Sequence, residues 1–328
     1  MNRKQSLERL QSRKQGIATR FAIEWTAFVA FLLLAGGALA TPVAAASSPQ
    51  PASNNVFSRT LTHPNASPEG AYGSWADASG NFIVVGAYNE TANGYTGAGH
   101  VYVYSAKTGA LLHTLTSPNA QTNGQFSGFG VAVSGNIVVV GAWNEAANGY
   151  AEAGHAYIFN AATGALLRTL TSPNPQTGGE FGNGIAVNGN IVVVGAWHEA
   201  VNGFAGAGRA YIYSADTGTL LRSFTSPNAQ TGGQFGWAIA LNGNTVDVSG
   251  WLETANGQAG AGHVYIFNID TGALIRTLTS PNAQTSGGFG EAVAAIGNIV
   301  VVGAPFEAAD GYAAAGHAYY YLGPPFSS

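Results

Sequence analysis

Cysteine is absent from the chain, methionine occurs once, and only 9% of the 328 residues are charged. Without cysteine there is no disulfide framework, and a thiolate nucleophile or metal ligand is excluded. After residue 55 no segment has the periodicity of an amphipathic helix. Glycine, in contrast, occurs 46 times, and most glycines punctuate short apolar runs, which favours an all-β fold.

The first 46 residues have the layout of an export signal. Six basic residues precede the apolar stretch 26–40, and small residues suited to cleavage lie at its end, 38–40, and at 44–46. Residues 26–46 are also long enough to cross a bilayer with the basic flank inside, so an uncleaved signal anchor is the alternative. We therefore expect an exported protein, secreted or held at the cell surface, with a Pro/Ser-rich linker at 47–55.

Removing this segment makes the remainder acidic. Six of the 12 basic and two of the 16 acidic residues lie within it, which leaves six basic against fourteen acidic residues and a net charge of −8. This balance argues against nucleic acid or an anionic membrane surface as a partner. An extracellular glycan or protein is the expected partner, and membrane contact is expected only through an uncleaved anchor.

Five copies of one sequence unit fill residues 56–328. The recurring stretch reads "GNIVVVGAWNEAANGYAEAGHAYIF" at Gly135, and its other copies begin at Gly80, Gly189, Gly243 and Gly297. Each unit of about 54 residues holds four β-rich runs separated by Gly and Asn turn signals. Four short strands per repeat is the pattern of a β-propeller blade, so the sequence predicts five four-stranded blades.

The phase of the repeat predicts how the propeller closes. "VFSRTLTHPNA" at 56–66 aligns with the fourth-strand segment "ALLHTLTSPNA" at 110–120, ahead of the first complete unit. The last unit lacks its fourth strand. We therefore expect residues 57–62 to pair into the last blade, which removes the exposed sheet edges. An open array, or one closed by a dimer, is the alternative.

The unit resembles the FG-GAP repeat, the blade of integrin α-subunit propellers and of many exported microbial proteins. The resemblance rests on Phe-Gly before the first strand, on "IVVVGA", and on "AGHAYIF", over roughly 56–322. The proline of "GAP" is present only at Pro305. The calcium loop of integrin-type blades, rich in Asp, is here only "SGN" or "NGN", so those cation sites are not carried over.

The loop between the second and third strands contains a repeated Glu and Asn. One Glu and one amide per loop are too few for calcium, which takes six to eight oxygens. No cofactor is expected, and calcium is kept only as a weak possibility at Glu145, Asn148, Glu307 and Asp310. The competing interpretation is that Asn-Gly permits a tight turn while Glu bonds nearby groups. The column His100, His155, Arg209, His263 and His317 is interpreted as structural.

Aromatic residues at both ends of these loops are the strongest binding signal. Faces of aromatic rings beside amides suit sugar rings, and repetition would add avidity. The alternative is that the rings extend the core. The predicted ligand-binding set is Tyr88, Trp143, Trp197, Trp251, Tyr95, Tyr150, Phe204, Tyr312, Asn148 and Asn202.

Catalysis is not expected, because near-identical blades give acid and base the same environment. The position after Phe-Gly varies freely, which predicts a solvated site at the central channel, and Glu291 is the acid there. If the protein is an enzyme, a glycan-active hydrolase, Glu291 is the candidate. We expect instead a non-catalytic recognition or adhesion module that binds glycans or proteins, with a purely structural surface protein as a further alternative.

Overall fold

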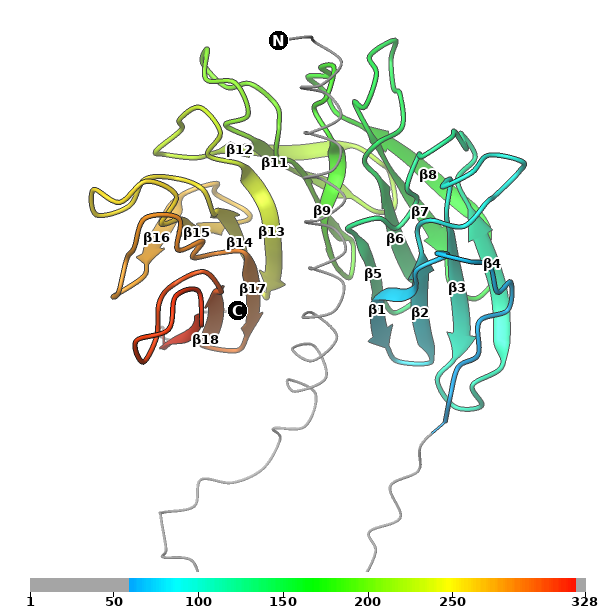
Figure 1. Cartoon of the computed structure of the whole chain (residues 1–328). Coiled ribbons are helices and arrows are strands. Elements are labelled where there is room, and N and C mark those ends of the chain that lie inside the picture. Colours follow the sequence, from blue (N-terminus) through cyan, green and yellow to red (C-terminus); the bar gives the residue numbers. More distant parts are fainter. Residues whose placement is uncertain (1–58, 323–328) are drawn as a thin grey trace, which may run out of the picture. The chain divides into compact units, whose positions relative to one another are not determined.

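The computed structural model describes residues 59–322, and its contacts divide the chain into two units, residues 1–61 and 62–328. The described part of the second unit is built from strands in five antiparallel sheets (Figure 1). The predicted all-β class with five repeated sheets is confirmed. The predicted export signal at 1–46 and the linker at 47–55 lie outside the described residues. Among residues 59–322, no helix is long and apolar enough to span a membrane.

Each sheet, here called a blade, follows chain order. Blade 1 contains β1 (Tyr72–Ser79), β2 (Phe82–Ala87), β3 (His100–Ser105) and β4 (Leu111–Thr116). Blade 2 contains β5 (Val131–Ser134), β6 (Ile137–Ala142), β7 (His155–Asn160) and β8 (Leu166–Thr171). Blade 3 contains β9 (Phe181–Asn188), β10 (Ile191–Ala196), β11 (Arg209–Ser214) and β12 (Leu220–Thr225). Blade 4 contains β13 (Phe235–Asn242), β14 (Thr245–Gly250), β15 (His263–Asn268) and β16 (Leu274–Thr279). Blade 5 contains β17 (Ala292–Ile296), β18 (Ile299–Ala304) and β19 (His317–Leu322).

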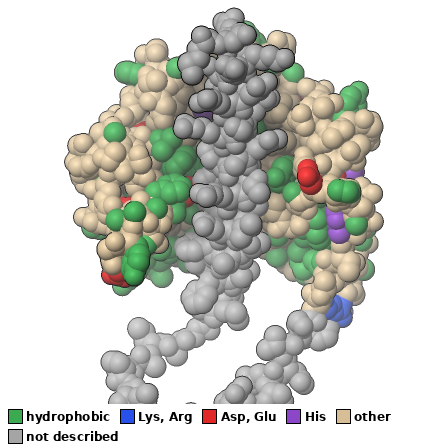
Figure 2. Space-filling view, in the orientation of Figure 1, with side chains coloured by type: hydrophobic (Ala, Val, Ile, Leu, Met, Phe, Trp, Pro, Cys, Tyr) green, Lys and Arg blue, Asp and Glu red, His purple; other side chains and the backbone are tan. Residues whose placement is uncertain are grey.

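The first strands of successive blades lie side by side, in the order β1, β5, β9, β13, β17. The core lies between the blades, where the second and third strands of one blade pack on those of the next. Between blades 2 and 3, for example, Val139 and Ile158 share one cluster with Phe181, Val194 and Tyr211. Both faces of an internal blade are therefore buried, which explains the unbroken Val and Ile runs. Figure 2 shows few charged side chains on the visible face, in keeping with the composition.

A glycine in "VVVGA" allows this close approach. A Cβ placed on Gly195 would lie 2.0 Å from the carbonyl oxygen of Gly236 in the next blade, and one on Gly141 would lie 1.8 Å from that of Gly182. Both distances are far inside van der Waals contact, so any side chain here would push two blades apart. The repeated glycine is thus a packing requirement between blades.

The segment before β1 contacts blade 1 in the way that the end of each outer strand contacts the following blade. Tyr104 donates a hydrogen bond to the Thr62 carbonyl at 3.5 Å, as Tyr213 does to Thr171 at 3.0 Å in blade 3. The alignment of 62–66 with a fourth-strand exit therefore holds. The predicted closing strand itself is only partly described: Phe57 and Ser58 lie outside the described residues, and residues 59–62 form no strand. In the described part, blade 5 has three strands.

Candidate functional site

The glutamate of each loop between the second and third strands is buried and accepts a hydrogen bond from a tyrosine of its own blade. Glu145 and Glu307 are 0% exposed. Tyr157 donates a hydrogen bond to Glu145 at 2.6 Å, and Tyr319 donates one to Glu307 at the same distance. The histidine column completes this arrangement, since His155 Nδ1 lies 3.0 Å from the Glu145 carboxylate. The structure thus supports the interpretation of these columns as structural.

The electrostatics of this arrangement follow from its burial. Loss of hydration raises the pKa of the Tyr157 hydroxyl, and the neighbouring Glu145 charge raises it further. In blade 3, burial raises the pKa of Glu199, while hydrogen bonds from Ser172 and Tyr211 oppose that rise. Arg209 replaces histidine here, with Nε 3.4 Å from the Glu199 carboxylate. At least one oxygen of each carboxylate therefore accepts a hydrogen bond within the protein.

The loop residues named as weak calcium candidates are placed for turns. Asn148 and Asp310 are exposed and have φ values of 51° and 52°, and Asn202 has the same conformation, φ 51°. This left-handed conformation suits Asn and Asp before glycine. Within residues 59–322, no group of three or more His, Asp or Glu side chains is arranged to hold a metal ion. That no cofactor binds, with calcium only as a weak possibility, stays a prediction.

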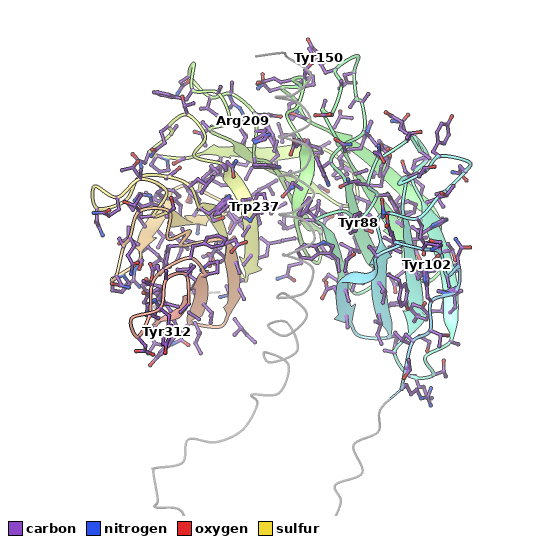
Figure 3. All side chains as sticks on the ribbon, in the orientation of Figure 1. Tyr88, Tyr102, Tyr150, Arg209, Trp237 and Tyr312 are labelled. Atoms are coloured by element: carbon purple, nitrogen blue, oxygen red, sulfur yellow. The ribbon has the colours of Figure 1, made fainter. Side chains whose placement is uncertain are left out.

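The two aromatic columns predicted to form clefts lie at different places. Tyr150 and Tyr312 are 44% and 73% exposed, and Figure 3 shows both at loop tips, away from Tyr88 and Trp237. Tyr95 and Phe204 are likewise 46% and 43% exposed. No ring contact among the described residues joins this outer column to the inner one. The predicted ligand-binding residues are thus brought together only in part.

The inner column instead joins aromatic rings of the first strands. Trp237 in β13 lies between Trp197 and Trp251, with ring centroids 4.9 and 5.2 Å away. Phe129 lies 5.9 Å from Trp237 and 5.6 Å from Trp143. Further contacts at 6.4 and 6.3 Å extend the series to Trp75 and Phe306. The inner aromatic strip consists of Trp75, Phe129, Trp143, Trp197, Trp237, Trp251 and Phe306.

Strand pairing explains why this strip forms. In each blade the first strand begins where the second strand ends, as the pair Phe181 and Ala196 illustrates. The residues after Phe-Gly and the tryptophans after "VVVGA" therefore meet at one end of the inner strands. All of these rings except Phe306 are half-buried, and Phe306 is 38% exposed. The strip crosses all five blades and keeps part of its aromatic surface accessible.

A polar group interrupts the strip at blade 3. His198 Nδ1 lies 3.2 Å from Glu180 Oε1, and its Nε2 lies 3.5 Å from the side-chain amide of Gln234. The rings of His198 and Trp197 lie 3.6 Å apart. Glu180 is 2% exposed, and its Oε2 has no hydrogen-bond partner among the described residues, nor has Gln234 Oε1. Both oxygens are buried acceptors beside the strip.

Backbone conformation makes this polar group notable. Glu180 and Gln234 have φ values of 56° and 57°, at a position where blade 5 has Gly288 with φ 68°. Glycine is the favoured residue in this conformation, so the side chains are carried at some cost in conformational energy. The sequence interpretation missed both residues because it followed the repeated columns. The signal was present as the non-repeated series Gln125, Glu180, Gln234 and Gly288.

The position after Phe-Gly, which its variability predicted to be solvated, is not solvated in every blade. Glu291 is only 3% exposed and Asn183 only 2%, so the prediction is wrong for these two residues, whereas Ser74, Phe129 and Trp237 at the same position are half-buried. Asp77, the other unusual acid, accepts hydrogen bonds from the backbone amides of Ala78 and Val133 at 2.8 and 2.7 Å. It thereby ties blade 1 to the first strand of blade 2. The variable column holds residues that pack against the neighbouring blade.

A family model described as FG-GAP repeat matches residues 112–159, 167–213 and 274–321. Each match runs from the outer strand of one blade to the third strand of the next. The matched units therefore begin with the fourth-strand segment, as the alignment of 56–66 with 110–120 predicts. The chain is an FG-GAP repeat protein. FG-GAP repeats form propeller-like modules often found in adhesion and recognition, they occur in extracellular and cell-surface proteins, and the family is typically non-catalytic.

Two designed proteins of known structure are similar to this FG-GAP repeat protein. The computationally designed Ika8 protein is 21% identical with a TM-score of 0.46, over 75% of this chain and 57% of that one. The chain therefore spans little more than half of Ika8. The designed Ika4 protein is 20% identical with a TM-score of 0.40, over 65% of this chain and 99% of that one. No curated protein matches the chain.

Proposed function

We propose that this FG-GAP repeat protein is an exported, non-catalytic recognition module that binds a glycan along the inner aromatic strip. The observation that carries the proposal is the continuity of the strip, from Trp75 in blade 1 to Phe306 in blade 5. Partly accessible aromatic faces pack well against the C–H faces of sugar rings. A strip that crosses several blades offers successive platforms, as a polymeric ligand requires.

The polar group at blade 3 supports a hydroxyl-bearing ligand over a purely apolar one. Glu180 Oε2 and Gln234 Oε1 are acceptors without partners among the described residues. Both oxygens are buried, so a ligand hydroxyl is expected to bond to the more exposed His198 ring beside them. His198 is held between these residues, and its side chain is 31% exposed. This group would set the position of one sugar unit on the strip.

A glycan array with paired variants tests the proposal. Trp237→Ala removes the central ring of the strip, whereas Tyr150→Ala removes a ring of similar chemistry from a loop tip. We expect the parent protein and Tyr150→Ala to bind the same glycans, and Trp237→Ala to lose most binding while keeping its melting temperature within a few degrees. Equal loss in both variants would favour the loop-tip column, and no binding by the parent protein would contradict the proposal.

The alternative function, a glycan-active hydrolase, finds no support in the placement of its candidate acid. Glu291 is 3% exposed, whereas an acid that protonates a glycosidic oxygen must reach the substrate. A protein ligand for the same strip remains compatible with the aromatic chemistry. The array therefore needs a parallel assay for product release from any glycan that binds, since turnover would favour the hydrolase.

A further inference from the structure

One face of blade 5 exposes side chains that the other blades bury. Tyr320 is 71% exposed and Leu322 is 61% exposed. The residues that match Tyr320 in the other blades are at most 1% exposed: Val103, Ile158, Ile212 and Ile266. Along β19 the exposure alternates, as it does when one face of a strand is covered and the other is not. The end face of blade 5 consists of Ile299, Val301, Gly303, Ala318, Tyr320 and Leu322.

The other interfaces identify what covers this kind of surface. Ile266 of blade 4 packs in a cluster with Phe289, Val300 and Val302 of blade 5. Ile212 of blade 3 packs in the corresponding cluster with Phe235 of blade 4. In each case the covering residues belong to the face of the next blade that points toward the preceding blade, here called its leading face. The end face of blade 5 therefore has the composition of a surface that receives another blade.

Blade 1 presents a leading face that no blade precedes within residues 59–322. Ala76 and Ala78 in β1 are exposed, and Ile83 is half-buried. The residues that match Ile83 are at most 3% exposed: Val138, Val192, Val246 and Val300. The leading face of blade 1, defined by Gly73, Ala76, Ala78 and Ile83, is thus open where the leading faces of the other blades are covered.

Two glycines show that the end face of blade 5 and the leading face of blade 1 lack a closely packed neighbour among the described residues. A Cβ on Gly195 would meet the Gly236 carbonyl oxygen of the next blade at 2.0 Å, but a Cβ on the matching Gly303 would have Ala292 Cβ, at 3.5 Å, as its nearest neighbour. Conversely, a Cβ on Gly236 would lie 2.3 Å from the carbonyl oxygen of Arg209 in the preceding blade, but one on Gly73 would meet no described atom within 4 Å. Between internal blades, a glycine such as Gly195 packs against the glycine of the next blade, here Gly236. Gly303 in blade 5 and Gly73 in blade 1 each lack that partner among the described residues.

We propose that the end face of blade 5 binds the leading face of blade 1 in a second copy of this chain, head to tail. The two faces have the residues of an internal blade interface, and neither carries a charged side chain that would oppose contact. Hydrophobic surface of this kind marks an interaction site. Because the two faces differ, the contact is heterologous and leaves a free face on each copy, so association continues or closes into a ring. This inference is independent of the proposed function.

Mixing two single-cysteine proteins tests the contact directly, because the chain has no cysteine of its own. Tyr320→Cys and Ile83→Cys are placed on the two faces, and mild oxidation of the mixture is expected to give a crosslinked heterodimer. The control pair replaces Tyr320→Cys with Tyr312→Cys, since Tyr312 is equally exposed at 73% but lies in a loop. An equal yield from both mixtures would overturn the proposal.

The same design distinguishes contact between copies from closure within one chain. In the Tyr320→Cys, Ile83→Cys double variant, a second copy gives crosslinked oligomers, whereas closure gives a crosslinked monomer and overturns the proposal. Sedimentation provides an independent readout without cysteine. We expect the mass of the parent protein to rise with concentration, Tyr320→Asp and Gly303→Ala to lose that rise, and Tyr312→Asp to keep it. A parent protein that stays monomeric at high concentration also overturns the proposal.

Discussion

The hydroxyl of Tyr211 donates a hydrogen bond to Glu199 at 2.5 Å, and these side chains are only 2% and 0% exposed. The tyrosine comes from the third strand of blade 3, and the glutamate from the loop that precedes it. Ser172 of blade 2 donates to the same carboxylate. One buried acid thus joins a strand, a loop and the preceding blade, and four other blades repeat the tyrosine contact.

Tyr211→Phe should destabilise the protein by about 2 kcal/mol. The change keeps the ring but removes the donor, so Glu199 stays buried with one hydrogen bond fewer, and bonds to charged groups contribute roughly 1.5–3 kcal/mol. Urea unfolding gives the free energy. Tyr150→Phe is the control, because that ring is 44% exposed and its loss should change stability by less than about 0.5 kcal/mol. Equal stability of both variants would show that the buried contact contributes little.

Gly195→Ala should destabilise the fold, whereas Gly303→Ala should not. The two glycines occupy the same position in blades 3 and 5, but only Gly195 faces the backbone of a following blade, with 2.0 Å to the Gly236 oxygen. Overpacking of this kind typically costs about 1–3 kcal/mol, and a rigid backbone neighbour gives little relief. Thermal unfolding at low protein concentration compares the two. A loss of stability in both would mean that the glycine serves the strand itself.

Chelation should leave the melting temperature unchanged. The loop glutamates, Glu145 and Glu307 among them, are 0% exposed, and one oxygen of each accepts a hydrogen bond from a tyrosine. One buried carboxylate per loop falls far short of the six to eight oxygen ligands that calcium requires. Scanning calorimetry with excess calcium and with chelator is the measurement. A decrease of several degrees on chelation would show that a cation site stabilises the fold.

The five repeats made the fold predictable from the sequence. The candidate site was not predictable in the same way, because it depends on residues that differ between the repeats. Five copies fixed the strands, the turns and the structural nature of the glutamate and histidine columns, because a feature present in every blade must serve the blade. Phe129, Trp237 and Glu180 contribute to the inner strip through differences between blades. Their neighbours come from two blades at once, and that proximity follows from how blades pack, which the sequence of one repeat does not encode.

Whether the first and last blades pack against each other was the least predictable part of the fold. The alignment correctly placed residues 62–66 as the end of an outer strand, because the Asn65 side chain reaches Glu90 just as Asn119 reaches Glu145. Whether the last blade then meets the first depends on the angle between blades. That angle arises from small side-chain differences summed over four interfaces. Tyr320 therefore occupies a core position when the five repeats are aligned, although it is 71% exposed in the structure.

Asp247→Val should stabilise the protein and remove a pH dependence. Asp247 is 1% exposed at the interface of blades 4 and 5, in a column where other blades have Val139, Val193 and Val301, and its carboxylate oxygens have no hydrogen-bond partner among the described residues. Burial raises its pKa from 3.8 to about 7. Between these values the folded protein holds a proton that the unfolded chain releases, so the free energy of unfolding falls as pH rises from about 4 to 7.

The charged form is thus tolerated at a cost on the order of 4 kcal/mol above pH 7, from about three pKa units at 1.36 kcal/mol each. Urea titrations at pH 5 and pH 8 should show the parent protein losing about 3 kcal/mol between them, since about two of the three units lie above pH 5, and Asp247→Val losing much less. Asp77→Ala serves as the comparison, since Asp77 accepts two backbone hydrogen bonds and its removal should destabilise. A valine variant no more stable than the parent at pH 8 would show that the carboxylate is solvated or paired in solution.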